Sequence, residues 1–212
     1  MLIKLAKIVK KSFRNLGERG YTLVEIAAVV AVTATLAAVV VPVAMDKIEK
    51  SKEARAADDV KALASAVAGF FGDTGVWPAR DANTPCGNHL YVLRTGNSTS
   101  NDPEDPDDKW PDYSGHDDFA QNHLVKNTPG GSTTCKYDNW AGPYAESLKD
   151  EDKRDPWGHN YLIWVRGMWD SSVQDYGWVI SAGPNGKLDT ATTDDELQGD
   201  DIGVAIYRAS SS

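Results

Sequence analysis

An uninterrupted apolar run near the N-terminus constrains this chain more than any other feature. No charged residue occurs from Ile26 to Met45, and a helix of about 20 residues is about 30 Å long, which matches the hydrocarbon core of a bilayer. Glu25 lies at the edge of this run, where a carboxylate costs about 2.5 kcal/mol or more. A fold for this chain must therefore give the run an apolar environment and give Glu25 a partner.

The apolar run separates a basic start from an acidic remainder. The first 20 residues contain six Lys and Arg and one Glu, so the remainder holds 16 basic and 30 acidic residues and a formal charge of −14, against −9 for the whole chain. The positive-inside rule places residues 1–20 in the cytoplasm and the rest outside. The acidic remainder favours divalent cations over nucleic acid as partners, because nucleic-acid affinity comes mainly from Lys and Arg that neutralise phosphates.

The N-terminal segment has two conventional interpretations. A secretory signal has a basic start, an apolar centre and a small-residue cleavage site. Here the run is longer than usual, and Pro42 falls where a small residue is expected for cleavage near Ala44. A plain membrane anchor explains the run but leaves Glu25 without a role.

The third interpretation is a resemblance, which the stretch RGYTLVEIAAVVAVTATLAAVVVP at 19–42 carries. This stretch resembles the N-terminus of type IV pilins and of the pseudopilins of type II secretion. Those proteins have a short basic leader that ends in Gly, then an aromatic residue, Thr-Leu, a hydrophobic residue, Glu and a long apolar helix. The resemblance implies a leader peptide over residues 1–20, prepilin peptidase cleavage after Gly20, and Tyr21 as an N-methylated first residue. Tyr21 replaces the usual Phe and keeps its aromatic character.

The same resemblance implies a role for Glu25. Cleavage creates a new amine at Tyr21, and in this family the glutamate of one subunit is thought to neutralise the amine of its neighbour in the filament core. Both charges are costly in an apolar environment unless they are paired. The alternative is that Glu25 extends its carboxylate to the lipid headgroups.

The resemblance also implies partners and a location. The partners are other pilins or pseudopilins in a helical filament, the prepilin peptidase and an inner-membrane assembly platform. The location is the bacterial inner membrane, with one span, a cytoplasmic N-terminus and a periplasmic C-terminal domain, until the subunit enters a filament.

The helical pattern continues beyond the apolar run. Apolar residues recur with the spacing of one face of an amphipathic helix, at Ala56, Val60, Leu63, Val67 and Phe70. We expect one helix from about Thr22 to Phe71, with a membrane or filament-core half over residues 21–45 and an amphipathic half over residues 46–72. Pro42 predicts a kink, and related filaments suggest instead that residues 34–42 lose helicity on assembly.

Residues 73–150 are expected to form a loop-rich insertion. Their acidic stretch STSNDPEDPDDKWPDYSGHDD at 98–118 is interrupted by three prolines, which indicates a solvated loop. Four residues of metal-binding types match no familiar ligand spacing and are interpreted as surface residues: His116, Asp117, Asp118 and His123.

The insertion also contains the two cysteines of the chain, Cys86 and Cys135. If this part of the protein is exported, we expect one disulfide, which would stabilise the fold by roughly 4 kcal/mol on the chain-entropy model. The alternative is two unpaired thiols in a cytosolic protein.

Residues 151–212 are expected to form a small antiparallel β-sheet. A turn signal, Asp155-Pro156 with Gly158, precedes three runs rich in β-branched and aromatic residues: YLIWV at 161–165, YGWVIS at 176–181 and IGVAIY at 202–207. A long helix packed on such a sheet is an α+β fold, which agrees with the type IV pilin-like fold that the resemblance implies.

An acidic, Gly-rich loop connects the last two of these runs. Clustered carboxylates and the carbonyls of Gly-rich turns are the ligands that Ca²⁺ requires, and a solvated acidic turn is the alternative. DPWG followed by two strands and SAGPNG…GDDIG resembles the C-terminal half of the major, G-type pseudopilins, in which this loop binds calcium. The resemblance implies Ca²⁺ ligands at Asn185, Asp200 and Asp201, with Asp189, Asp194 and Asp195 as alternative ligands.

We therefore expect a structural subunit of a pilus-like filament rather than an enzyme, because the sequence has no nucleophile elbow, HExxH motif or phosphate-binding Gly loop. DPWG and the acidic loop favour a pseudopilin of the type II protein secretion system. A type IV pilin that serves adhesion, motility or DNA uptake is the alternative, favoured by the disulfide and the long insertion. A third hypothesis is a membrane-anchored or secreted calcium-binding domain that does not polymerise.

Overall fold

A computed structural model describes residues 20–111, 114–149 and 152–208 of the chain. The predicted leader therefore lies outside the described residues except for Gly20. The chain divides into two compact units, Met1–Ile48 and Glu49–Ser212.

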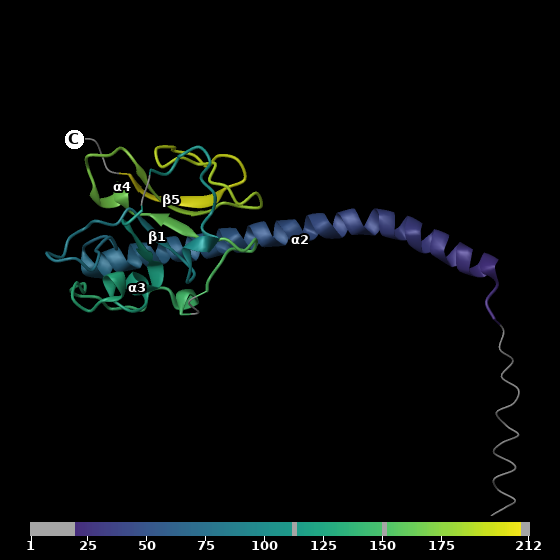
Figure 1. Cartoon of the computed structure of the whole chain (residues 1–212), viewed down its shortest axis with the longest axis horizontal. Helices are drawn as coiled ribbons and strands as arrows, with labels where there is room; N and C mark the ends of the chain where they lie inside the picture. The colour runs from purple at the N-terminus through teal and green to yellow at the C-terminus, as the bar shows by residue number, and fades with distance from the viewer. Residues whose placement is uncertain (1–19, 112–113, 150–151, 209–212) are drawn as a thin grey trace, which may run out of the picture. The chain divides into compact units, whose positions relative to one another are not determined.

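One helix, α2, runs from Leu23 to Thr74 and contains 52 residues (Figure 1). The predicted helix from about Thr22 to Phe71 is confirmed. Residues 34–42 are helical in the single chain, so a loss of helicity on assembly stays a prediction. By length and composition, α2 could cross a membrane once.

The second unit contains a five-stranded sheet with the strand order β2-β1-β3-β4-β5. The strands are β1 (Val92–Arg94), β2 (Asp117–Phe119), β3 (Leu162–Trp164), β4 (Tyr176–Ser181) and β5 (Ile202–Arg208). All neighbouring pairs are antiparallel except β1 and β2, which are parallel. The three predicted strand runs correspond to β3, β4 and β5, so the α+β fold is confirmed.

Short helices lie between the strands of this unit. The α-helices are α3 (Ala120–Leu124) and α4 (Arg166–Trp169), and the 3₁₀ helices are η1 (Thr99–Asn101), η2 (Pro129–Gly131) and η3 (Glu146–Leu148).

The amphipathic half of α2 packs on one face of the sheet. All five predicted apolar positions of this helix face are buried, and Phe70 belongs to the same core as Leu93 and Ile163. Side chains alternate between the two faces of a strand, so Leu162 and Trp164 of β3 point to the opposite face. The sheet is therefore apolar on both faces and needs a second cover.

Part of the insertion provides this second cover. Trp110 is 1% exposed, and its ring packs edge-on against Trp164 with the ring centroids 5.3 Å apart. The prediction of a solvated loop is wrong at this position, because burial of one large aromatic side chain outweighs the polar composition around it. The insertion is thus a layer of the fold at Trp110.

The interpretation of Asp118 and His123 as surface residues is also wrong. His123 is fully buried and Asp118 is 8% exposed. His123 Nε2 lies 2.9 Å from Asp118 Oδ2, and His123 Nδ1 lies 2.7 Å from the Tyr137 hydroxyl. Strand β2 and helix α3 turn these side chains inward, where they satisfy each other.

One contribution to the pH dependence of stability comes from this buried pair. Burial alone would raise the pKa of Asp118, but its hydrogen bond and charge interaction with His123 and the N–H groups of Gly130 and Phe119 outweigh burial and lower it. A carboxyl whose pKa is lower in the folded state stabilises the fold above its unfolded pKa, about 4, and loses this effect as the pH falls.

We expect Asp118→Asn to destabilise the protein by about 2 kcal/mol at pH 7, because it removes a buried charge-assisted hydrogen bond. The difference from wild type should shrink as the pH falls below about 4. Denaturant unfolding at several pH values measures this difference in the free energy of unfolding. Asp152→Asn is the control, because Asp152 pairs with Arg154 at the surface. A pH-independent loss in Asp118→Asn would contradict the charge assignment.

The predicted disulfide is confirmed. Cys86 and Cys135 are joined, with their Cα atoms 5.4 Å apart. The bond connects the start of the insertion to the segment that follows η2, close to Tyr137 in sequence. It therefore stabilises the same region of the insertion as the Asp118–His123 pair.

Candidate assembly segment and cation site

Glu25 takes part in the N-terminal cap of helix α2. The backbone N–H and the hydroxyl of Thr22 both donate to Glu25 Oε2, at 2.9 and 2.8 Å, and the N–H of Glu25 donates to Thr22 Oγ1 at 3.2 Å. This reciprocal arrangement is a capping box. Our sequence interpretation missed this role, although the spacing Thr22-x-x-Glu25 is its usual signature.

Gly20 and Tyr21 precede this cap as an exposed segment. Tyr21 is 81% exposed, and a Cβ placed on Gly20 would meet no atom within 4 Å. Neither packing nor a positive φ angle in this chain therefore requires glycine at position 20.

The first half of α2 exposes its apolar side chains. Every large apolar residue from Leu23 to Ile48 is between 50% and 85% exposed. The two threonines in this stretch donate their hydroxyls to the carbonyl oxygens of Val29, Val30 and Val32 in the preceding turn, so they leave no hydroxyl hydrogen unpaired. An exposed apolar helix of this size indicates a covering by lipid or by other helices.

The acidic loop, residues 182–201, brings three of the predicted cation ligands together. The N–H of Asn185 donates to Asp200 Oδ2 at 3.0 Å, and its side-chain amide donates to Asp189 Oδ2 at 3.0 Å. Glycines allow these approaches: a Cβ on Gly183 would lie 2.2 Å from the Asp200 carbonyl oxygen, and a Cβ on Gly199 would lie 2.0 Å from Asp189 Oδ2.

Asp201 lies beneath this cluster. Its Oδ2 accepts hydrogen bonds from the N–H groups of Asp189 and Thr190, at 2.9 and 2.7 Å. The side chain is 7% exposed, and burial raises the pKa of Asp201 to about 6. A buried carboxylate with a raised pKa would be stabilised by a nearby cation.

The acidic loop offers carboxylate and amide oxygen atoms, the ligand type that a hard cation such as Ca²⁺ prefers. Asp200 Oδ1 and Asp201 Oδ1 are buried and accept no hydrogen bond from any described residue, which is a costly state for a carboxylate oxygen. In the part of the chain that the structure describes, no three His, Cys, Asp or Glu side chains form a group placed to hold a metal. A cation here would therefore need the Asn185 amide or backbone carbonyl oxygens as further ligands.

The two remaining alternative ligands lie outside this cluster. Asp194 Oδ2 accepts a hydrogen bond from the N–H of Ala191, and Asp195 is exposed. Asp189 is therefore the alternative ligand that the loop conformation favours.

Comparison with known proteins finds a similarity to a fimbrial protein. A 65-residue stretch is 34% identical to the fimbrial protein EcpC of Eikenella corrodens, and this stretch covers 31% of the present chain and 42% of that protein. No family model matches the chain, and no solved structure matches it. The similarity to a fimbrial protein and the long apolar N-terminal helix fit a pilin-like protein.

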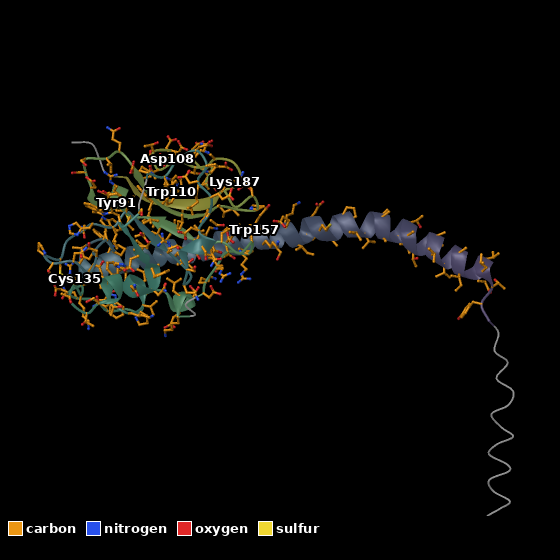
Figure 2. All side chains as sticks on the ribbon, in the orientation of Figure 1. Tyr91, Asp108, Trp110, Cys135, Trp157 and Lys187 are labelled. Atoms are coloured by element: carbon orange, nitrogen blue, oxygen red, sulfur yellow. A yellow bond between two sulfur atoms is a disulfide. The ribbon has the colours of Figure 1, made fainter. Side chains whose placement is uncertain are left out.

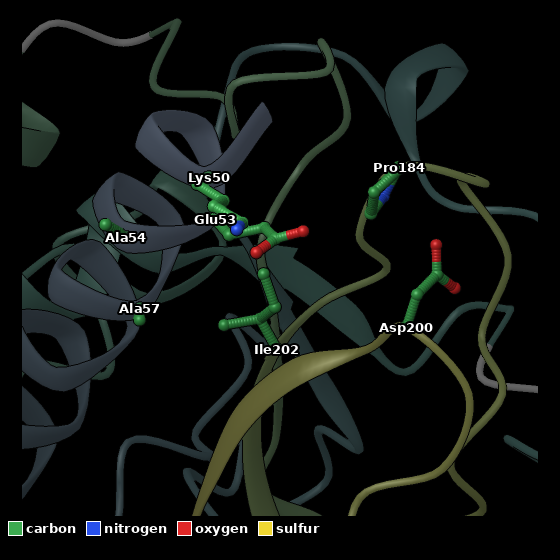
Figure 3. Close-up of a pocket in the computed structure, with 7 residues that line it drawn as sticks. All are labelled: Lys50, Glu53, Ala54, Ala57, Pro184, Asp200 and Ile202. Atoms are coloured by element: carbon green, nitrogen blue, oxygen red, sulfur yellow. The ribbon is translucent and has the colours of Figure 1, made fainter. Parts of the chain in front are cut away.

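A groove of about 490 Å³ borders the acidic loop (Figure 3). Helix α2 forms one side and the loop with the start of β5 forms the other, through Lys50, Glu53, Ala54, Ala57, Pro184, Asp200 and Ile202. Asp200 belongs to both the groove and the Asn185 cluster, so a change in its conformation would change the wall of the groove.

Proposed function

We propose that this protein is a structural subunit of a pilus-like filament. The observation that carries the proposal is the first half of α2, in which every large apolar side chain is at least half exposed directly after Gly20 and Tyr21. The similarity to a fimbrial protein supports it. This role needs no catalytic activity.

The proposed maturation explains the residues before the helix. A prepilin peptidase removes residues 1–20, and the new amine of Tyr21 is methylated. Glycine at position 20 has no structural cause within the chain, which favours a requirement of the peptidase. The helix anchors the subunit in the inner membrane, with the N-terminus cytoplasmic and the second unit periplasmic, until the assembly platform transfers it to the filament.

The proposed role of Glu25 in assembly is compatible with its role in the cap. Both hydrogen bonds from Thr22 end on Oε2, so the amine of a neighbouring subunit can approach Oε1. Glu25 would then cap its own helix with Oε2 and neutralise the amine of the neighbouring subunit with Oε1. A filament preparation sheared from cells tests the proposal, because it should contain this chain.

Within the filament class, we favour a pseudopilin of the type II secretion system, because of DPWG and the acidic loop. A type IV pilin is the second candidate, favoured by the observed disulfide and by the folded insertion. Disruption of the gene separates the two. Loss of exported enzymes from the medium indicates a secretion role, and loss of surface pili indicates the second candidate.

The acidic loop is proposed to bind Ca²⁺ through Asn185, Asp200 and Asp201, with Asp189 as a further ligand. Because these carboxylates do not form a ready metal site in the cation-free chain, binding would have to draw them together. The cation would supply the missing partner for the two buried carboxylate oxygens. A chelator should therefore lower the melting temperature by several degrees and Ca²⁺ should restore it, since a ligand that binds only the folded state stabilises that state. Mg²⁺ at the same concentration is the control. An unchanged melting temperature would contradict the site.

A further inference from the structure

The insertion segment, residues 99–111, is hydrogen-bonded to the acidic loop at Glu104 and at Trp110. The N–H of Glu104 donates to the Gly186 carbonyl oxygen at 2.9 Å, and the N–H of Leu188 donates to the Glu104 carbonyl oxygen at 2.8 Å. Further along, Trp110 Nε1 donates to the Thr190 carbonyl oxygen at 2.9 Å. Figure 2 shows Trp110 and Lys187, from these two segments, on the same side of the domain. The position of one segment therefore depends on the other.

Lys109 places a cationic side chain at this contact. Its Nζ lies 3.7 Å from Asp189 Oδ1 and 3.6 Å from Asp107 Oδ2, and its side chain is 26% exposed. The carboxylate of Asp105 accepts hydrogen bonds from the backbone N–H groups of Lys109 and Trp110, at 2.9 and 2.8 Å. These bonds and the buried indole of Trp110 fix the backbone from which the lysine side chain extends toward Asp189.

Asp189 therefore faces two different surroundings. Its Oδ1 lies near the Lys109 ammonium, while its Oδ2 accepts the Asn185 amide in the cluster that contains Asp200. The ammonium offsets part of the negative charge of the cluster. A divalent cation at the cluster would be attracted by the same charge and repelled by the ammonium.

We infer that Lys109 is an internal counter-ion that sets how strongly the acidic loop binds divalent cations. This inference rests on the proposed calcium site and adds the residue that regulates it. Without Lys109, the carboxylates would repel one another more strongly in the cation-free protein and attract a cation more strongly. The insertion segment would thus reduce the dependence of the loop on calcium.

The test compares three variants of the full chain in detergent: Lys109→Met, Lys109→Arg and Lys149→Met. Lys149 is exposed and pairs with Glu146 outside the acidic loop, so its replacement changes the net charge equally and is the matched control. Calcium titration should show about fivefold tighter binding for Lys109→Met than for wild type, as expected for loss of one partly exposed charge interaction. Lys109→Arg and Lys149→Met should remain close to wild type.

The melting temperature in chelator is the second readout. Lys109→Met should have a lower melting temperature than Lys149→Met in chelator, and this difference should narrow in saturating Ca²⁺. If wild type binds Ca²⁺ and Lys109→Met binds it no more tightly than Lys149→Met, the inference about Lys109 is overturned while the calcium site stands. If wild type binds no Ca²⁺, both the site and the inference are overturned.

Discussion

Glu25→Ala is expected to abolish filament assembly while the chain still inserts into the membrane. Loss of the carboxylate removes a charge from the edge of the apolar run, so insertion becomes no more costly. It also leaves the amine at Tyr21 of the neighbouring subunit without a partner in an apolar filament core, where an unpaired charge is strongly unfavourable. Membrane fractionation and the yield of sheared filaments measure the two effects separately.

Two further variants separate charge pairing from helix capping. Glu25→Gln keeps an acceptor for the Thr22 hydrogen bonds but removes the charge. Thr22→Val removes the hydroxyl of the capping box but keeps the Glu25 charge. We expect Glu25→Gln to fail in assembly. Thr22→Val should assemble with a modestly lower filament yield, because a lost N-cap costs about 1 kcal/mol of helix stability. Normal filaments from Glu25→Gln would contradict the pairing.

Trp110→Ala is expected to destabilise the second unit by about 3 to 5 kcal/mol, the usual cost of truncating a buried tryptophan. The change removes the cover over Trp164 and the hydrogen bond to the Thr190 carbonyl oxygen. Both the insertion segment and the acidic loop should then become sensitive to protease. Denaturant unfolding of the full chain in detergent measures the loss of stability.

Trp157→Ala is the matched control for this experiment. Trp157 is partly exposed, and its Nε1 donates to the Glu49 carboxylate. We expect its replacement to cost about 1 kcal/mol, the net value of one hydrogen bond. Equal losses in the two variants would contradict the assignment of Trp110 as the anchor of the insertion.

The long helix and three strands could be predicted because their signals are local. The apolar spacing of α2 and the β-branched runs of β3, β4 and β5 each span several turns or residues, and the structure confirms them. Strands β1, β2 and β3 contain three residues each, and β3 could be predicted because it lies within the longer run YLIWV. Asp117–Phe119 is also acidic and has low β propensity, so only its pairing with β1 makes it a strand.

The buried positions of the insertion could not be predicted for a different reason. Asp118 and His123 are buried because Tyr137 and Gly130 supply partners for them, and these contacts depend on the folded chain. Trp110 is buried because the second face of the sheet needs a cover. Composition describes the segment on average and cannot identify the side chain that anchors it.

The candidate sites also combine features with a local sequence signal and features that depend on contacts in the folded chain. The apolar run and the pilin resemblance predicted a helix from about Thr22, and the T-x-x-E spacing would also have indicated the capping box. In the acidic loop, residue types alone could not show which carboxylates are the better candidates for cation ligands. Asp189 joins Asn185 while Asp194 bonds to Ala191, because turns at Gly183 and Gly199, both with positive φ, determine which side chains meet.

The N-terminal residue of the protein isolated from its native membrane is the most direct test of a filament subunit. We predict N-methylated Tyr21, after removal of residues 1–20. Gly20→Leu should block this processing, whereas Gly17→Leu in the same leader should permit it. A wild-type chain that begins at Met1 would indicate a simple anchor, and one that begins near Met45 would indicate ordinary secretion; either result would contradict assembly through Tyr21 and Glu25.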